Sequence, residues 1–255
     1  MDTKRSWRWP IVSLIFGICL LISLILNVVL YNASTLYYRE LNQVRLNPLD
    51  LDAYAVATVP HSVATKRIRV LFLGDSRAYQ WPAPVINERF EFFNRGIGAQ
   101  TTAQVLLRFD EHVAPLHPNV VIVQIGINDL KAVPLFPAQK RQIIGNCENN
   151  IASVVAQARQ LGATVILTTI FPTGDVPVAR RLVWSSEIEQ AVVEVNAYIH
   201  SLAGPNVVIF DSAQLLADSN GKTQKSYQVD TLHINQIGYA MLNQQLAALL
   251  TKVVH

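Results

Sequence analysis

Five short apolar runs, separated by stretches with helical periodicity, constrain the fold of this 255-residue chain most strongly. The runs occupy residues 69–73, 90–94, 120–125, 163–170 and 207–210. Near-continuous apolar runs of this length are typical of strands that are buried on both faces of a sheet. Apolar residues recur at helical spacing in the intervening and final stretches, at residues 101–114, 139–161, 187–203 and 236–253. Strands that alternate with helices predict βαβ units and a parallel sheet with helices on both faces.

The expected fold class is therefore α/β, a three-layer α/β/α sandwich around a five-stranded parallel sheet. We favour a flavodoxin-like strand order, 2-1-3-4-5, because its switch point separates the loops after the first and third strands. Loops at the carboxyl ends of parallel strands meet in a common crevice. Polar residues in these loops are therefore expected to act together, even when they lie far apart in the sequence.

Residues 11–30, IVSLIFGICLLISLILNVVL, carry no charge. About 20 residues rising 1.5 Å each span a hydrocarbon core of roughly 30 Å. Lys4, Arg5 and Arg8 precede the run, so the positive-inside rule predicts a cytoplasmic N-terminus and an extracytoplasmic remainder. A cleaved signal peptide is the alternative, but the run exceeds the usual apolar region of about 7–15 residues and no small-x-small cleavage site follows it. We predict a stub at 1–10, a single transmembrane anchor at 11–30, a juxtamembrane linker at 31–66 and a folded domain at 67–255.

Charge and cysteine content indicate which partners and cross-links the exported domain is not expected to have. Residues 1–10 hold three basic groups and one acidic group, so +2 of the net charge of +3 belongs to the stub. The remainder is nearly balanced and has no basic stripe, which predicts no nucleic-acid partner. Cys19 lies in the anchor and Cys147 is alone outside it, so no disulfide can form within the exported domain. We expect no metal and no other cofactor.

Four polar patches fall at the ends of the apolar runs or just before the last helix. They are GDS at 74–76, NRGIGA at 94–99, GIND at 126–129 and DTLH at 230–233. Each patch is weak evidence alone, because such triplets often form turns or cap helices and glycines often serve turn geometry. Their occurrence together, each at an expected strand end or at the start of the last helix, predicts an esterase-type active site.

The chemistry needs a nucleophile, a base and a site for negative charge. The Ser76 hydroxyl is a weak nucleophile that needs an adjacent base. Asp230 precedes His233 by three residues, so its carboxylate can reach the imidazole Nδ1 and leave Nε2 to take the serine proton. Asp211, at the end of the fifth run, is a rival acid for which we expect a structural role. The Asn128 amide and a backbone N–H of the 96–99 turn are suitable oxyanion donors.

Across about residues 67–255 the chain resembles the SGNH (GDSL-like) hydrolase family of esterases, lipases and acetylesterases. The family's first, third and fifth blocks match residues 74–76, 126–129 and 230–233. The resemblance implies the flavodoxin-like SGNH fold and ester hydrolysis without a cofactor. It also implies that Ser76 is the nucleophile, His233 the base and Asp230 its orienter, with Asn128 and the backbone N–H of Ser76 as oxyanion donors.

The second block departs from the family pattern. Residues 94–102, NRGIGAQTT, resemble the family's Asn-x-Gly-Ile-x-Gly-x-Thr stretch, but Ala99 stands where the donor glycine is expected. The alanine N–H can serve if its φ is negative, and Gly98 is the donor if the turn is shifted. Arg77 replaces the apolar residue of many relatives and favours an acidic or sugar substrate, unless it is a solvated surface residue. Arg180, in the segment 172–181, is a second pocket candidate, with a plain surface loop as the alternative.

These observations predict a membrane-anchored, extracytoplasmic serine esterase. The expected substrates are O-acyl groups, especially O-acetyl groups, on envelope or exported glycans or on lipids, followed by lysophospholipids and thioesters. An acyltransferase that passes the acyl group to a sugar hydroxyl of an envelope polysaccharide would use the same residues. A non-catalytic binding module on this fold would lack a member of the triad. The sequence does not indicate any protein partner.

Overall fold

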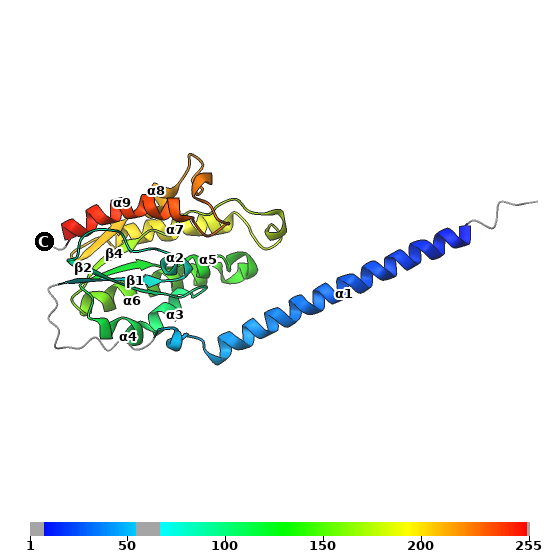
Figure 1. Ribbon diagram of the computed structural model, residues 1–255, viewed down its shortest axis with the longest axis horizontal. Coiled ribbons are helices and arrows are strands. Elements are labelled where there is room, and N and C mark those ends of the chain that lie inside the picture. The colour runs from blue at the N-terminus through cyan, green and yellow to red at the C-terminus, as the bar shows by residue number, and fades with distance from the viewer. Residues whose placement is uncertain (1–7, 55–66, 254–255) are drawn as a thin grey trace, which may run out of the picture. The chain divides into compact units, whose positions relative to one another are not determined.

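The computed structural model describes residues 8–54 and 67–253, in two compact units, Met1–Pro48 and Leu49–His255 (Figure 1). The first unit is one continuous helix, α1 (Arg8–Leu46). Among the described residues, this is the one helix that is long and apolar enough to cross a membrane, with a mean hydropathy of 2.8 in its most apolar window. At 1.5 Å per residue, its 39 residues span about 58 Å, so α1 extends well beyond the apolar run at residues 11–30.

The second unit is built on a five-stranded, wholly parallel sheet with the order β2-β1-β3-β4-β5. The α/β class and the predicted strand order are both confirmed. The strands are β1 (Ile68–Gly74), β2 (Phe90–Gly96), β3 (Val120–Gln124), β4 (Thr164–Thr168) and β5 (Val207–Phe210). Every residue of β3 is buried, as the apolar residues 120–123 predict for a central strand covered on both faces.

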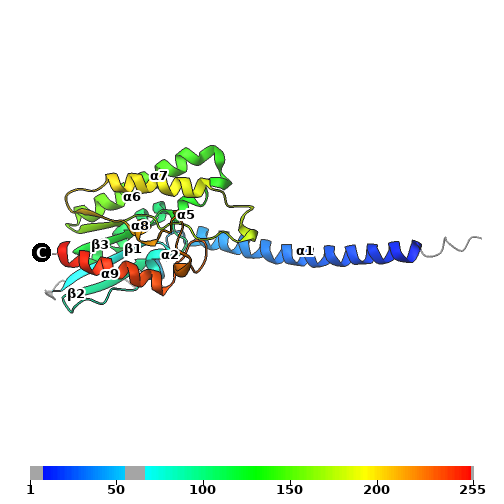
Figure 2. The same ribbon diagram turned by 90° about the horizontal axis from the view of Figure 1, so that it is seen from above.

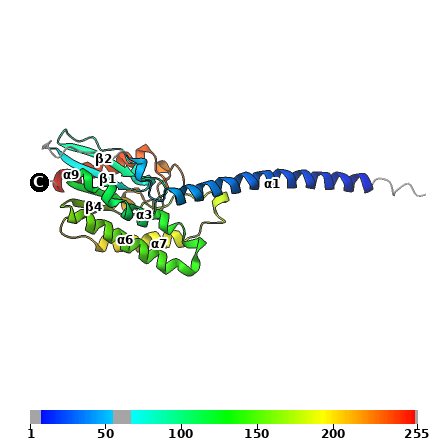
Figure 3. The ribbon, with the colours of Figure 1, turned by 90° about the horizontal axis from the view of Figure 1, so that it is seen from below.

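Alternate strand residues feed two separate hydrophobic cores. Leu71 and Val121 point to the core shared with α3 (Thr102–Leu107), α4 (Phe109–His112), α6 (Lys140–Gln160) and α7 (Glu187–Ser201). Phe72 and Ile122 point to the core shared with α8 (Ser212–Leu216) and α9 (Gln236–Val253). Figure 2 shows α6 and α7 on one side of the strands and α9 on the other, and Figure 3 shows α6 and α7 side by side. The predicted three-layer sandwich is therefore present.

Two predicted elements end differently in the structure. The helix expected at 101–114 is divided into α3, α4 and the 3-10 segment η2 (Ala114–Leu116). Arg108, with a φ of −96° and a ψ of 6°, separates α3 from α4, and Val113 separates α4 from η2. The strand expected at 163–170 ends at Thr168. Beyond it, the backbone N–H and C=O of Ile170 bond to the side chain of Asn196 at 2.7 and 3.0 Å rather than to a neighbouring strand.

The predicted linker at residues 31–66 is not one structural piece. Its first part, up to Leu46, continues α1, and residues 55–66 lie outside the described residues. Between them, the segment 49–54 contains the 3-10 turn η1 (Leu51–Ala53) and belongs to the second unit. The Gln100 amide donates to Leu49 O at 3.0 Å, the His112 ring contacts Leu51 O at 3.0 Å, and the Tyr54 hydroxyl donates to Gly96 O.

Candidate active site

Ser76 begins the four-residue helix α2 (Ser76–Tyr79), directly after β1. The turn is tight, because a Cβ at Gly74 would lie 1.9 Å from the carbonyl oxygen of Gln124 on β3. The Asp75 carboxylate accepts the backbone N–H of Arg77 at 2.8 Å and so caps the helix. Asp75 is fully buried, while Ser76 is half-buried. The chain therefore presents the serine at the carboxyl edge of the sheet on a sharp strand-to-helix turn.

The three residues of the expected triad lie within hydrogen-bond distance of one another. Ser76 Oγ is 2.9 Å from His233 Nε2, and His233 Nδ1 is 2.9 Å from Asp230 Oδ2. Burial alone would raise the pKa of Asp230, but hydrogen bonds from His233 and from the backbone N–H groups of Leu232 and His233 outweigh it and lower that pKa. An ionised carboxylate favours the proton on Nδ1, which leaves the Nε2 lone pair facing the serine hydroxyl.

The turn that carries Asp230 and His233 is held by the loop after β4 and by the start of α9. Gly174 N donates to Thr231 O at 2.8 Å, and Thr231 Oγ1 donates to Asp175 O at 3.0 Å. Asn235 caps α9 by accepting the N–H groups of Ile237 and Gly238 at 3.0 and 3.1 Å. Hydrogen bonds therefore hold the segment 230–233 both at Thr231 and just beyond His233, at the start of α9.

The oxyanion candidates lie on the loops after β2 and β3. Asn128, on α5 (Ile127–Leu130), is 6% exposed, and its Nδ2 donates one hydrogen bond to Gln100 O at 3.0 Å. An amide nitrogen has two hydrogens, so one remains for a substrate oxygen. The Asp129 carboxylate accepts the backbone N–H and the hydroxyl of Thr102 at 2.9 and 2.7 Å. These bonds tie the GIND turn to the start of α3.

Ala99 does not have the backbone geometry expected of it. Its φ is +62°, so the condition of a negative φ is not met. For an L-residue the left-handed conformation costs roughly 1–2 kcal/mol, and glycine adopts it readily. Gly98 and Ala99 are both exposed, and within the described part of the chain neither N–H donates a hydrogen bond. By the condition set for Ala99, Gly98 becomes the first candidate oxyanion donor, and the N–H of Ala99 is the second.

The two predicted pocket arginines lie in different environments. Arg77 is fully buried, with its guanidinium turned inward to the carbonyl oxygens of Leu232 and Phe171. This finding corrects both expectations for Arg77, since it neither faces a substrate pocket nor lies in solvent. Arg180 is exposed in the 3-10 segment η5 (Val178–Arg180). Its neighbour Arg181 lines a large cavity.

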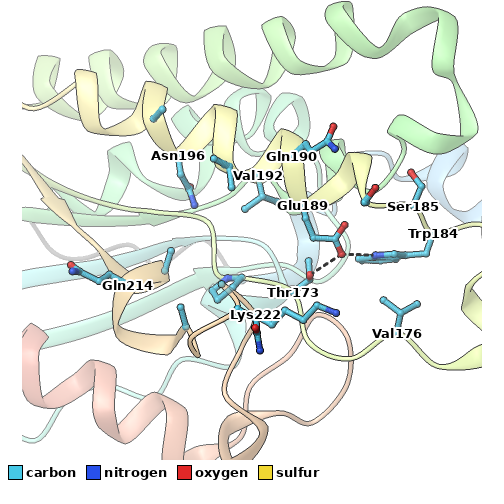
Figure 4. Close-up of a pocket in the computed structure, with 18 of the residues that line it drawn as sticks. Thr173, Val176, Trp184, Ser185, Glu189, Gln190, Val192, Asn196, Gln214 and Lys222 are labelled. Atoms are coloured by element: carbon cyan, nitrogen blue, oxygen red, sulfur yellow. Dashed lines mark hydrogen bonds between the residues drawn. The ribbon is translucent and has the colours of Figure 1, made fainter.

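That cavity has a volume of about 1110 Å³ and lies between α7, the loop after β4 and residues 211–222 (Figure 4). Its lining includes Val176 and Lys222 but none of the triad residues or Asn128. Figure 4 shows Thr173 and Trp184 directed at Glu189, whose Oε1 accepts their hydrogen bonds at 3.1 and 3.0 Å. The backbone bond from Gly174 N to Thr231 O connects the loop that lines this cavity to the turn that carries Asp230 and His233.

A second buried arginine, Arg108, was missed by the sequence analysis. Its guanidinium donates to Gly74 O at 3.0 Å, to Arg95 O at 2.9 Å and to the side chain of Gln100. Burial lowers its pKa to about 10. The signal in the sequence is the spacing of three residues between Arg108 and the buried Val105, which in the expected helix at 101–114 would place both on one face. This side chain fixes the ends of β1 and β2 beside the turn of residues 96–99.

Asp211 has other partners than the triad histidine. Its Oδ1 accepts Thr169 Oγ1 at 3.0 Å and the backbone N–H of Gln214 at 3.1 Å, and its Oδ2 lies 3.4 Å from His200 Nε2. It caps α8, as its expected structural role requires. Within residues 8–54 and 67–253, no group of three or more His, Cys, Asp or Glu side chains is arranged to hold a metal ion.

Comparison with known proteins gives a consistent result. The GDSL-like Lipase/Acylhydrolase family matches residues 67–241. A curated relative, the platelet-activating factor acetylhydrolase IB subunit alpha1 of Pongo abelii, is 25% identical over 196 residues, which cover 74% of this chain and 78% of the relative.

Solved structures share the fold. A GDSL-like lipase from Bacteroides thetaiotaomicron matches with a TM-score of 0.59 at 24% identity, covering 80% of this chain and 95% of that one. An acetyl xylan esterase matches with a TM-score of 0.56 at 20% identity, covering 74% of this chain and all of the other. Since the family match extends over more than half of its length, this chain belongs to the GDSL-like lipase/acylhydrolase family and is an ester-hydrolysing enzyme.

Proposed function

We propose that this protein is a membrane-anchored serine esterase that acts outside the cytoplasm through an acyl-enzyme. The observation that carries the proposal is the continuous hydrogen-bonded chain from Ser76 Oγ through the His233 ring to the Asp230 carboxylate. Nucleophile, base and orienter in this order form the arrangement that activates a serine hydroxyl.

In the first half-reaction, Ser76 Oγ attacks the ester carbonyl carbon while His233 Nε2 accepts the hydroxyl proton. The carbonyl oxygen becomes an oxyanion, stabilised by the Ser76 N–H, the free Asn128 amide hydrogen and an N–H of Gly98 or Ala99. When the intermediate collapses, the C–O bond to the alcohol breaks, and the imidazolium gives its proton to the leaving alkoxide. The acyl group stays on Ser76.

In the second half-reaction, His233 takes a proton from water as the water oxygen attacks the acyl carbon. Collapse of this second intermediate releases the carboxylic acid and returns the proton to Ser76 Oγ. Asp230 keeps its negative charge throughout and stabilises the imidazolium that forms in each half-reaction. The residues named here need no cofactor for these steps.

The N-terminal sequence supports the anchor and the location. α1 has the length and apolarity of a membrane span, and Lys4, Arg5 and Arg8 lie at or before its start. Basic residues next to a first span favour retention of that end in the cytoplasm. The catalytic unit then lies on the opposite side, where envelope or exported glycans and lipids are accessible.

We further propose that the acyl groups removed are short, with O-acetyl groups on glycans or lipids as the leading class. Support comes from the names of three similar proteins. One is an acetylhydrolase, one an acetyl xylan esterase, and one an acetyl-xylooligosaccharide esterase from Geobacillus Stearmophilus, which is 19% identical with a TM-score of 0.53. An O-acetyltransferase acting on envelope polysaccharide would share the acyl-enzyme and differ in the acceptor.

The test uses the full-length protein in detergent with an aryl acetate and with an acetylated glycan. The Ser76→Ala variant should retain its circular dichroism spectrum and lose hydrolysis, whereas undiminished turnover would refute the assignment. Product analysis with an acceptor sugar present separates the two reaction types. Free acetate identifies the esterase, and acetylated sugar identifies the transferase.

A further inference from the structure

A cation is buried directly beside the proposed nucleophile. Arg77 is the second residue of α2 and has no exposed surface. Its Nε donates to Leu232 O at 2.9 Å, one terminal nitrogen donates to Phe171 O at 3.1 Å, and its guanidinium carbon lies 5.2 Å from the centre of the Phe171 ring. Burying a charge is unfavourable unless hydrogen bonds compensate for it. These contacts compensate for part of that cost, because the second terminal nitrogen of Arg77 is buried without a hydrogen-bond partner among the described residues.

The contacts of Arg77 join the segments that carry the nucleophile and the base. Leu232 immediately precedes His233, and Phe171 lies three residues beyond the end of β4. Within the described part of the chain, no other group donates to the two carbonyl oxygens. The guanidinium therefore links the turn of Ser76 to a segment about 155 residues away in the sequence.

The backbone of the same residue binds the element that follows His233. The hydroxyl of Tyr239, on α9, donates to Arg77 O at 2.8 Å. Burial raises the pKa of Tyr239, so this group remains a neutral donor. Arg77 therefore bonds to the chain on both sides of His233. Its side chain bonds to Leu232, just before the histidine, and its carbonyl oxygen bonds to Tyr239, on the helix that follows it.

We infer that Arg77 is a positioning residue of the active site, which holds the His233 imidazole within hydrogen-bond distance of Ser76 Oγ by fixing the Leu232 carbonyl. The inference rests on the proposed function. Lysine cannot replace the contact fully, because one ammonium group does not reproduce the planar fork that reaches two carbonyl oxygens. Leucine removes both donors and leaves buried acceptors without partners.

The experiment compares Arg77→Lys and Arg77→Leu with wild type and with a matched control, Asn243→Ala. Asn243 ties the segment after α2 to α9, since its side chain bonds the Trp81 ring nitrogen at 2.8 Å and Pro82 O at 3.0 Å. It has no contact with the Asp230–His233 turn in the described residues. The control therefore loosens the same helix without releasing Leu232.

Hydrolysis of an aryl acetate is measured per mole of folded protein, with the folded fraction taken from circular dichroism. Since a displacement of about 1 Å can cost on the order of 10²-fold in rate, both Arg77 variants should lose roughly 10–100-fold in kcat. KM should stay within about twofold, because the groups that bind substrate are unchanged. Asn243→Ala should keep kcat within about threefold of wild type, even though its loss of thermal stability is comparable with that of the Arg77 variants.

Three results would overturn the inference. The first is a folded Arg77→Leu with wild-type kcat. The second is an Asn243→Ala that loses as much kcat as the Arg77 variants at an equal loss of thermal stability. The third is failure of both Arg77 variants to fold, which would make Arg77 a folding residue. If only Arg77→Leu fails to fold, Arg77→Lys decides the question, and a folded Arg77→Lys with wild-type kcat would overturn the inference. Failure of the proposed function is distinct, because it appears as a wild-type protein without hydrolysis or as an active Ser76→Ala.

Discussion

Replacing Asp230 by asparagine tests the proposed proton path at one atom. Asp230 Oδ1 accepts the backbone N–H groups of Leu232 and His233 at 2.7 and 2.8 Å, while Oδ2 faces His233 Nδ1 at 2.9 Å. An asparagine that keeps the two backbone bonds must place its oxygen at the Oδ1 position. Its NH₂ group then faces Nδ1, which has to become the acceptor. The proton moves to Nε2, and the imidazole can no longer accept the proton of Ser76.

The size of the effect follows from this change of tautomer. In other Ser-His-Asp enzymes, the corresponding substitution lowers kcat about 10⁴-fold, which is about 5 kcal/mol of transition-state stabilisation. We expect a loss of similar order here, with KM nearly unchanged and the fold retained, because the two backbone bonds survive.

The assay is aryl acetate hydrolysis by full-length Asp230→Asn, with Asp211→Asn as the matched control. Asp211 caps α8 and lies beside His200, so its replacement should lower stability slightly and leave kcat unchanged. A folded Asp230→Asn with kcat within about tenfold of wild type would refute the tautomer argument.

Three further predictions concern stability. Ala99→Gly should raise the free energy of unfolding by about 0.5–1 kcal/mol in urea titrations, because glycine holds a φ of +62° without steric cost; a loss of stability would contradict the strain argument. Burial raises the pKa of Asp75 from 3.8 to about 6. The folded state therefore disfavours the ionised form, and this carboxyl lowers stability by about 3 kcal/mol above pH 6 but not near pH 4. Asp75→Asn should accordingly gain stability over wild type as the pH rises across this range, and equal differences at both ends would exclude the effect. Tyr54→Phe loses the bond to Gly96 O and should cost about 1 kcal/mol; no shift in the thermal midpoint would show that the segment 49–54 does not brace this turn.

Much of the fold followed from the sequence because the strands are buried on both faces. Val121 and Ile122 on β3 point into different cores, so the strand is apolar on both faces over residues 120–123. Parallel strands then place all their carboxyl ends at one edge, and this explains why residues as distant as Ser76 and His233 meet there. The alternation of apolar runs and helical stretches was therefore sufficient to predict the parallel sheet and the convergence of its carboxyl-end loops.

Other features depend on contacts that no local pattern encodes. The burial of Arg77 and Arg108 could not be predicted, because the carbonyl oxygens that accept their hydrogen bonds come from distant segments. The segment 49–54 falls in the predicted linker because its apolar residues, such as Leu51 and Tyr54, form no long helical or strand pattern. Its backbone carbonyls nevertheless bind Gln100 and His112. The φ of Ala99 is set by the turn around it rather than by the residue itself.

The central claim is that an acyl group passes through Ser76. Full-length protein turning over an aryl acetate can be quenched in acid, digested and mapped by mass spectrometry. We expect an acetyl group on the peptide that contains Ser76 and none on the corresponding peptide of Ser76→Ala. Steady hydrolysis with an unmodified Ser76, or with the acetyl group on another residue, would contradict it.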